Sequence, residues 1–527
     1  MRRGFKIATA VAALSTLGLT PALGVVEQRT PVTGLSPFEP GPCNTQPQTG
    51  TLYLNSEVEP WLDVDPTSAE DADGPDFLGV YQQDRYSDGG ARGLGTAVST
   101  DGAANFTIVP VSDLPDFTQC VGNDLYERGT DPWVSFAPNG DAYQISLSFN
   151  NTENLDNAVL VSKAAKPAAD EDRVWGSPTT LKRDTNPSVF NDKESITADQ
   201  NDANYVYAVW DRLVFPNERT HGKSYLNTSA FRGPTWFSRT TNGGSSWETA
   251  RPIFDPGQND QTIGNQIVAL GNEDLVNVMT VFKFDNRNKQ RGGTVAVLRS
   301  SDHGANWSGQ ITVSRLGSVG VTDPKDGHPV RTGDIIPEIA SDEQGGRDEV
   351  YVVWQDARFN DFQRDQVAFS RSTDGGLTWS EPIRISTHNE TQAFTPAIRV
   401  DDDGNIGVTY YDFRNDDPNS PELETDLWFS RSTDGGDTWS EERITQEPFD
   451  MRTAPDANGY FVGDYEGLSA LGTTFYPFWS ESHASGTDVF AATVNATSPA
   501  VTYRPSTTEG DQPASAFPVV KGKPIPR

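Results

Sequence analysis

Residues 372–379 read Ser-Thr-Asp-Gly-Gly-Leu-Thr-Trp, and residues 432–439 repeat this octapeptide with one substitution. Looser copies of this box occupy residues 99–106, 240–247 and 300–307. The closing aromatic residues of successive boxes are 60 or 72 residues apart, except for a first interval of 141 residues. The long interval corresponds to two units, one of which has lost its box. Repeats of this length, built from short β-rich segments, are typical of a β-propeller.

The box has the composition of a hairpin turn. Strand-like runs precede and follow it, as residues 366–371 and 380–385 do around the copy at 372–379. An Asp or Asn at the third position can accept hydrogen bonds from nearby backbone N–H groups, and the glycines can adopt a positive φ. The box therefore predicts a turn between two strands, with the closing aromatic residue folded back onto the sheet.

Seven segments can be aligned as the innermost strands of successive units. They are residues 59–64, 131–136, 193–198, 265–270, 337–342, 396–401 and 465–470. The sequence thus predicts an all-β propeller of seven four-stranded blades, with six blades as the alternative. The last unit lacks a box and a fourth strand, and residues 51–55 are expected to supply the missing edge strand and close the ring.

Composition predicts an exported protein with one large domain. Residues 1–24 carry three basic residues and then an apolar run that ends in small residues, as a cleaved signal peptide does. We expect an N-terminal arm at 25–50, the propeller at 51–494 and a Pro/Ser/Thr-rich tail at 495–527. The predicted location is secreted and extracellular, and no later segment is apolar enough to cross a membrane.

Charge and cysteine content limit the possible partners. The net charge of −33 argues against nucleic acid and anionic membrane as partners, and we expect a monomer. Cys43 and Cys120 either form a disulfide after export or remain free thiols. No cofactor is expected, although the acidic segment 63–76 could bind calcium as a structural ion.

The expected topology places the starts of the inner strands and the ends of the second strands on one rim, away from the boxes. This rim gathers the acidic and aromatic candidates Glu59, Asp131, Glu194, Glu338, Tyr465 and Glu466, and the basic candidates Arg85, Arg212, Arg358 and Arg414. Carboxyl groups of this kind can bind a sugar or supply an acid and a base for glycosidic cleavage. Because Asp-Arg or Asp-x-Arg pairs recur in four units, the arginines could instead form ion pairs between neighbouring blades.

The repeated box resembles the Asp-box, or bacterial neuraminidase repeat, of the sialidase-like superfamily. In exo-α-sialidases of that superfamily, three arginines bind the substrate carboxylate, a Tyr assisted by a Glu is the nucleophile, and an Asp is the acid/base. The resemblance implies a catalytic set of Asp131, Glu194, Glu338 and Tyr465. It implies substrate binding by Arg85, Arg212, Arg358 and Arg414, with Glu59 and Glu466 beside them.

The chain departs from sialidases at three points. It has no Arg-Ile-Pro motif before the first blade, it has seven units in place of six, and its neighbouring Tyr465 and Glu466 would point to opposite sides of a strand. We therefore expect a secreted, sialidase-like glycoside hydrolase that acts on an anionic glycan, and keep two alternatives. These are a non-catalytic glycan- or protein-binding propeller and a polysaccharide lyase acting on a uronate polymer.

Overall fold

The computed structural model describes residues 28–38, 41–152, 154–168, 171–215, 232–284, 290–342, 348–495 and 502–507. The predicted signal peptide and most of the predicted tail lie outside these residues. Within them the regular structure consists of β-strands and short 3-10 helices, so the all-β prediction is confirmed. No helix of the described ranges has the length and apolar character needed to cross a membrane.

The strands form antiparallel meanders that follow one another along the chain. The first two meanders are joined through Ala91 and Gly129 into one sheet. The strands of this sheet are β2 (Glu57–Val64), β3 (Phe77–Arg85), β4 (Ala91–Ser99), β5 (Thr107–Ile108), β6 (Arg128–Phe136), β7 (Ala142–Phe149), β8 (Asn157–Ala164) and β9 (Thr179–Asp184). Two four-stranded sheets follow, made of β10 (Val189–Ala198), β11 (Tyr205–Val214), β12 (Thr235–Thr241) and β13 (Arg251–Phe254), and of β14 (Gln261–Ala269), β15 (Leu275–Phe284), β16 (Gln290–Ser300) and β17 (Ile311–Leu316).

Three further meanders complete the main series of sheets. The first contains β20 (Glu338–Ser341), β21 (Val350–Asp356), β22 (Gln366–Ser372) and β23 (Ile383–Arg384), with β33 (Ser506–Thr507) at its edge. The second contains β24 (Ala393–Val400), β25 (Ile406–Asp412), β26 (Glu424–Ser432) and β27 (Ser440–Arg443), with β28 (Phe449–Asp450) paired to β26. The third contains β30 (Gly467–Leu471), β31 (Thr474–His483) and β32 (Gly486–Thr493), with β1 (Gln28–Pro31) at its edge. A small separate sheet contains β18 (Val321–Thr322), β19 (Pro329–Arg331) and β29 (Tyr460–Phe461). The 3-10 helices are η1 (Pro66–Ser68), η2 (Val111–Asp113), η3 (Gln119–Val121), η6 (Arg358–Asn360) and η7 (Met451–Thr453).

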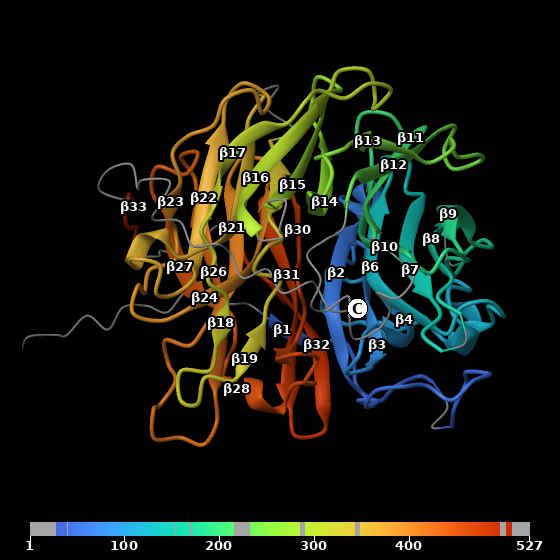
Figure 1. Cartoon of the computed structure of the whole chain (residues 1–527), viewed down its shortest axis with the longest axis horizontal. Helices are drawn as coiled ribbons and strands as arrows, with labels where there is room; N and C mark the ends of the chain where they lie inside the picture. Colours follow the sequence, from blue (N-terminus) through green and yellow to red (C-terminus); the bar gives the residue numbers. More distant parts are fainter. Residues whose placement is uncertain are drawn as a thin grey trace, which may run out of the picture.

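The first strand of each meander packs against the first strand of the next. Contacts join β2 to β6, β6 to β10, β10 to β14, β14 to β20, β20 to β24 and β24 to β30, and β30 in turn lies against β2. Figure 1 shows this last junction near the centre of the view, where blue β2 runs beside orange-red β30 and β31. Each segment that the sequence predicted as an inner strand is the first strand of a meander, which confirms the alignment of the repeats.

The edge strand of the last sheet is not the one predicted. It is β1, which pairs antiparallel with β32 and therefore comes from the segment expected to be an irregular arm. Residues 51–55 instead lie beside the end of β3. There Leu52 forms a β-bridge with Tyr86, and the Tyr53 N–H donates to the Arg85 carbonyl at 2.8 Å. The prediction for residues 51–55 is wrong: Leu52 and Leu54 are 36% and 43% exposed, and the segment bonds to the end of β3 instead of to β32 as an edge strand.

Five of the first strands contain a β-bulge at the same place. The register of pairing with the second strand shifts there, and the residue inside the shift has a positive φ. These residues are Glu59 (54°), Asp131 (50°), Lys193 (50°), Gly264 (69°) and Thr395 (49°). Glycine adopts this left-handed conformation without strain, whereas the other four residues are held in it by the surrounding sheet.

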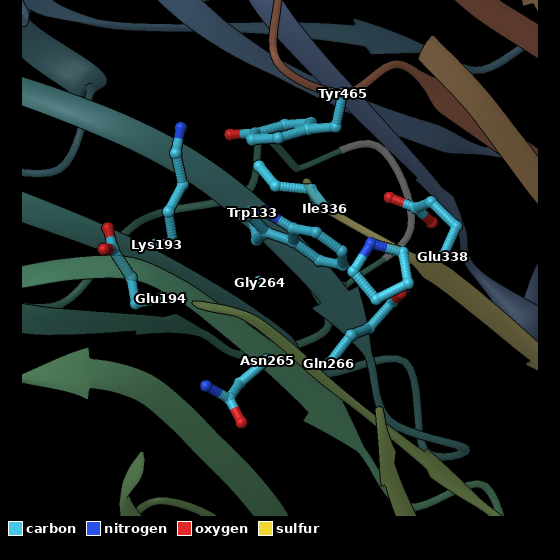
Figure 2. A pocket seen from close by; sticks show the side chains of 10 residues that line it. Trp133, Lys193, Glu194, Gly264, Asn265, Gln266, Ile336, Glu338 and Tyr465 are labelled. Atoms are coloured by element: carbon cyan, nitrogen blue, oxygen red, sulfur yellow. The ribbon is translucent and has the colours of Figure 1, made fainter. Parts of the chain in front are cut away.

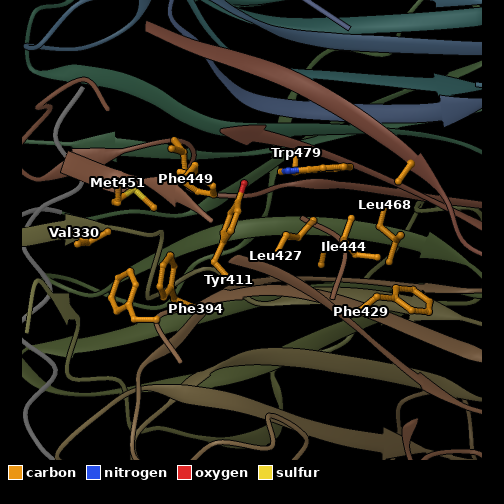
Figure 3. Close-up of a cluster of buried hydrophobic side chains, with 14 of the residues drawn as sticks. Val330, Phe394, Tyr411, Leu427, Phe429, Ile444, Phe449, Met451, Leu468 and Trp479 are labelled. Atoms are coloured by element: carbon orange, nitrogen blue, oxygen red, sulfur yellow. The ribbon is translucent and has the colours of Figure 1, made fainter. Parts of the chain in front are cut away.

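Apolar side chains fill the space between neighbouring meanders. Figure 3 shows one such cluster, to which strands β24 to β26 and β30 to β32 contribute. Tyr411, Phe429 and Trp479 in this cluster are at most 1% exposed. Burial of large aromatic side chains in this way fixes one meander against the next.

Both ends of the described chain are tied to the sheets. Cys43 and Cys120 form a disulfide, which links the segment before β2 to η3. Near the other end, Tyr503 exchanges two backbone hydrogen bonds with Trp439, at 2.9 and 2.7 Å, and its hydroxyl donates to the Ile385 carbonyl at 2.5 Å. Residues 502–507, which the sequence assigned to an irregular tail, therefore cover the edge of β23 through β33.

The box at residues 372–379 forms the predicted turn. Asp374 accepts hydrogen bonds from the Ser372 hydroxyl at 2.8 Å, from the Thr378 N–H at 2.8 Å and from the Thr378 hydroxyl at 2.6 Å. The Trp379 indole N–H donates to the Gly376 carbonyl at 3.2 Å. The box at 432–439 makes the equivalent bonds, so the repeat is a unit of local structure.

Replacement of Asp374 by Ala should destabilise the protein and leave ligand binding unchanged. The variant loses local turn bonds on an exposed loop, so the free energy of unfolding should fall by about 1 kcal/mol. Urea denaturation followed by tryptophan fluorescence measures this change. Leu377→Ala on the same turn, where the side chain is 53% exposed, is the control and should have little effect. A folded Asp374→Ala protein that no longer binds its ligand would contradict the structural role of the box.

Candidate functional site

Three of the bulge residues meet where the first strands begin. The Lys193 ammonium on β10 lies 2.9 Å from a Glu59 carboxylate oxygen on β2 and 2.6 Å from an Asp131 oxygen on β6. A third carboxylate, that of Asp464, lies 2.8 Å from the same ammonium. All four side chains are buried. The bulges thus gather charged side chains from separate meanders in one place.

Two guanidinium groups adjoin this charged cluster. Arg331, at the end of β19, makes two hydrogen bonds to the Asp464 carboxylate at 3.0 and 2.5 Å. Arg85, at the end of β3, donates to the Gln82 side chain at 2.9 Å. The Phe461 ring on β29 contacts both, with its centroid 4.2 Å from the Arg331 guanidinium carbon and 5.0 Å from that of Arg85.

A small pocket, with room for roughly one water molecule, opens beside Lys193. Its lining comes from the bulged middle parts of β6, β10 and β14, from the start of β20 and the residues just before it, and from the segment before β30. The lining residues are Trp133, Lys193, Glu194, Gly264, Asn265, Gln266, Ile336, Pro337, Glu338 and Tyr465. Figure 2 shows the Trp133 ring between Glu194 on one side and Glu338 on the other, with Tyr465 above it.

The two glutamates of the pocket have unsatisfied oxygens. Within the described ranges, no other residue bonds to the carboxyl oxygens of Glu194, which contact only its own backbone N–H, and only one oxygen of Glu338 has a partner, Gln266. Both side chains are nearly inaccessible, at 1% and 2% exposed. Because an ionised carboxylate in this setting would lack solvation, both groups favour the protonated form.

Burial dominates the acid–base properties of the site. Burial and the nearby Asp131 carboxylate raise the pKa of Glu194 well above its usual value, and burial raises the pKa of Glu338 to about 8. Burial also raises the pKa of Glu59 to about 7, although Lys193 opposes this shift. The pKa of Asp464 would rise by burial alone, but Arg331 and Lys193 hold it well below its usual range. The site therefore contains carboxyl groups in both protonation states near neutral pH.

The structure places several of the predicted residues in or beside the pocket. Glu194, Glu338 and Tyr465 line it, and Glu59 and Asp131 reach it through Lys193. The Tyr465 hydroxyl donates to the Pro132 carbonyl at 3.2 Å, and its ring centroid lies 5.6 Å from that of Trp133.

Three of the four predicted arginines are engaged elsewhere. Arg212 pairs with Asp184 at 2.6 Å, Arg358 pairs with Asp356 at 2.7 Å, and Arg414 pairs with Asp412 at 2.6 Å and with Glu441 at 2.5 Å. The contacts of Arg358 and Arg414 lie within one sheet, and the contact of Arg212 joins two consecutive sheets. None of the three arginines lines the pocket. The expected cluster of four arginines is therefore not formed, and these three make structural ion pairs, whereas Arg85 does adjoin the site.

Glu466 is also placed away from the pocket. Its carboxylate accepts a hydrogen bond from the Tyr411 hydroxyl at 2.8 Å and one from the Ser480 N–H at 3.3 Å. As expected from strand alternation, it points away from the side chain of Tyr465.

Sequence reasoning missed three residues of the site. Lys193 was recognised only as the start of an inner strand, because its inward direction depends on the bulge. Arg331 and Phe461 lie in the small sheet of β18, β19 and β29, whose sequence carries no repeat.

Within the described ranges, no group of three or more His, Cys, Asp or Glu side chains is arranged to hold a metal ion, and this includes the acidic segment 63–76.

Comparison with known proteins identifies the repeats. Residues 235–448 match the BNR repeat-like domain, so the chain carries repeats of this type. No curated protein sequence matches the chain.

Solved structures similar to the chain include several carbohydrate-active enzymes. A Hadza microbial sialidase is 13% identical, with 89% of this chain and 95% of the sialidase covered and a TM-score of 0.44. An α-L-arabinanase of Penicillium chrysogenum, complexed with arabinobiose, is 10% identical, with 88% and 98% covered and a TM-score of 0.45. A Trypanosoma rangeli sialidase, in complex with sialic acid, is 15% identical, with 74% and 55% covered and a TM-score of 0.39.

Proposed function

We propose that this protein is a sialidase-like glycoside hydrolase that cleaves an anionic glycan in the pocket lined by Glu194 and Glu338. The observation that carries the proposal is the pair of buried carboxyl groups with unsatisfied oxygens on either side of the Trp133 ring. Glycosidic cleavage needs one carboxyl group to protonate the leaving oxygen and a second to act on the other side of the bond.

The two glutamates differ in a way that suits these two roles. Glu194 has no hydrogen bond to another residue within the described ranges, and burial and the nearby Asp131 carboxylate favour its protonated form, so we assign it the role of proton donor. Glu338 is held by Gln266 and is influenced by Arg399, and its pKa of about 8 allows it to ionise in mild alkali and act as the base. Trp133 stacks on Trp61 and packs against Tyr465, so these buried aromatic rings form a rigid wall of the pocket.

The preference for an anionic glycan rests on Arg85 and Arg331. Arg331 shares its charge with Asp464, but Arg85 has no carboxylate within 4.0 Å in the described part of the chain. Burial and the neighbouring Arg331 lower the pKa of Arg85 to about 10, which is the expected result of placing two cations close together. Arg85 is 1% exposed and lies outside the pocket lining, so a carboxylate of the substrate would be bound through the more accessible Arg331.

We further propose that the meanders close as a seven-bladed propeller and that the protein is secreted. The chain of contacts from β2 through β30 and back to β2 supports closure, since in a ring each sheet packs its faces against two neighbours and no apolar face is left exposed. The signal-like sequence of residues 1–24 and the disulfide between Cys43 and Cys120 support export to an oxidising compartment.

Incubation of the purified protein with a panel of substrates tests the activity. The panel contains 4-methylumbelliferyl glycosides, sialosides and uronate polymers, and released products are measured by fluorescence and chromatography. Hydrolysis of an anionic member supports the proposal. Products with an unsaturated uronate end would show a lyase, and glycan binding without any product would show a binding propeller.

The pH profile of hydrolysis should have a rising limb governed by Glu338. Because the base must be ionised and its pKa is about 8, kcat/KM should increase as the pH rises from 6 to 8. Glu338→Gln should remove this limb together with most of the activity. A wild-type rate that already reaches its plateau near pH 5 would show that Glu338 is not the base.

A further inference from the structure

Lys193 is the point at which three parts of the chain meet. Its ammonium contacts Glu59 on β2, Asp131 on β6 and Asp464 before β30, at 2.9, 2.6 and 2.8 Å. Its side chain is only 5% exposed, so these carboxylates replace most of its hydration. Such a buried cation is stable only because its partners are ionised and well placed.

The backbone of Lys193 supports a specific purpose for this residue. It sits in the bulge of β10 with a φ of 50°, in a conformation that glycine adopts freely and lysine does not. Gly264 shows that the neighbouring strand uses glycine at the equivalent place. Strained positions of this kind persist where a side chain is needed, and here the need is the ammonium.

The contacts of Lys193 divide the carboxyl groups of the site into two classes. Glu59, Asp131 and Asp464 contact the ammonium, whereas Glu194 has no hydrogen bond to it. Figure 2 shows the Lys193 side chain running away from the Glu194 carboxyl group and toward Tyr465. The other groups that face Lys193 are Asp192, Arg331, Tyr465 and Glu194, whose pKa the Lys193 charge lowers less than burial and Asp131 raise it.

We propose that Lys193 is a positioning residue that holds Glu59 and Asp131 in place and favours their ionised forms, so that the transferable proton of the site resides on Glu194. This inference rests on the proposed function for its catalytic meaning, but the ion pairs exist independently of it. Lys193 is the main group that lowers the pKa values of Glu59 and Asp131 against the effect of burial. Without Lys193 these two groups should bind protons at neutral pH, and the negative charge that disfavours ionisation of Glu194 should be lost.

The pH dependence of stability in Lys193→Met tests this inference without any need for activity. Removal of the ammonium raises the folded-state pKa values of Glu59 and Asp131 further above their unfolded values. At low pH the variant should therefore be as stable, relative to wild type, as its packing allows. It should lose stability relative to wild type as the pH rises toward the folded-state pKa values of Glu59 and Asp131 in the variant. Wild-type Glu59 is already largely protonated below its pKa of about 7, so its part of the difference should appear above that pH. If the folded variant then holds one additional proton, its folded-to-unfolded ratio relative to wild type should fall about tenfold per pH unit from about pH 7 upward.

Matched variants separate this effect from a general loss of packing. Lys163→Met removes another lysine ion pair, at 2.7 Å to Asp141, and should change stability without this pH dependence. Lys193→Arg should retain much of the wild-type profile because it keeps the charge. If Lys193→Met is unfolded at pH 8, adding Asp131→Asn should restore folding, because one of the uncompensated carboxylates is then removed.

The outcomes distinguish the two proposals. A stability profile of Lys193→Met that is parallel to wild type, or a failure of Asp131→Asn to improve it at pH 8, would overturn the role of Lys193. A wild-type protein that hydrolyses nothing, while Lys193→Met shows the expected profile, would overturn the proposed function alone. If both hold, Lys193→Met should lower kcat at pH 7 far more than it changes KM, and Lys193→Arg should recover part of that loss.

Discussion

Replacement of Glu194 by Gln is expected to lower kcat by about 10²- to 10⁴-fold, which is the usual contribution of general acid–base catalysis. The amide keeps the size and polarity of the carboxylic acid but cannot release a proton to the leaving oxygen. Since Glu194 is uncharged in its proposed working state, the substitution should leave substrate affinity nearly unchanged. Initial rates at saturating substrate, together with calorimetric titration of an intact glycan, measure the two quantities.

The control for Glu194→Gln is Glu273→Gln. Glu273 lies on a turn remote from the pocket and its side chain is 61% exposed, so the same chemical change should have no effect on rate or affinity. A Glu194→Gln enzyme that retains more than a tenth of the wild-type kcat would remove this residue from the role of proton donor. Activity of such a variant on substrates with a highly acidic leaving group would instead support the role, since these substrates need little protonation.

Removal of residues 28–31 is expected to be the most destabilising of the changes described. It deletes β1, so β32 loses its ladder of backbone bonds, worth about 2–5 kcal/mol in total if each bond contributes about 1 kcal/mol. The exposed edge of β32 should also pair with other molecules and promote aggregation. Thermal unfolding and size-exclusion chromatography measure both effects.

Arg29→Ala provides the comparison for the removal of β1. This substitution removes the ion pair with Glu481 at 2.5 Å but keeps the strand, and its cost should not exceed about 1 kcal/mol because Arg29 is partly exposed. An unchanged melting temperature after removal of the whole strand would show that β1 does not contribute to closure of the last sheet.

The repeat made the strands predictable, but the chemistry of the site depends on features outside the repeat. The boxes and aligned segments identify the turns and the first strands because local hydrogen bonding and apolar alternation determine both. The closing strand escaped prediction because β1 has only four residues and no periodic pattern. Its pairing depends on β32, which is more than 450 residues away in the chain.

The structure brings most of the predicted acids together and places three of the four predicted arginines elsewhere. Glu194 and Glu338 could be found because each lies at the start of a segment that the repeat aligns as an inner strand. This position places both on one rim, regardless of how their side chains are oriented. Arg358 and Arg414 were misassigned because each lies two residues after an aspartate that it can reach without tertiary structure. Arg331 could not be found because only the pairing of β19 with β29 brings it to Asp464.

Because five of the first strands share the same bulge, each of these repeats can present a different side chain at an equivalent position. At one equivalent position the fold accepts an acid in β2 and β6, a base in β10, a glycine in β14 and a hydroxyl in β24. The backbone there is already turned toward its neighbours, so a point mutation changes the chemistry presented to a ligand without a rearrangement of the hydrophobic layers. A duplicated ancestor with the same residue in every repeat could thus diversify one repeat at a time, and new specificities could arise through single substitutions.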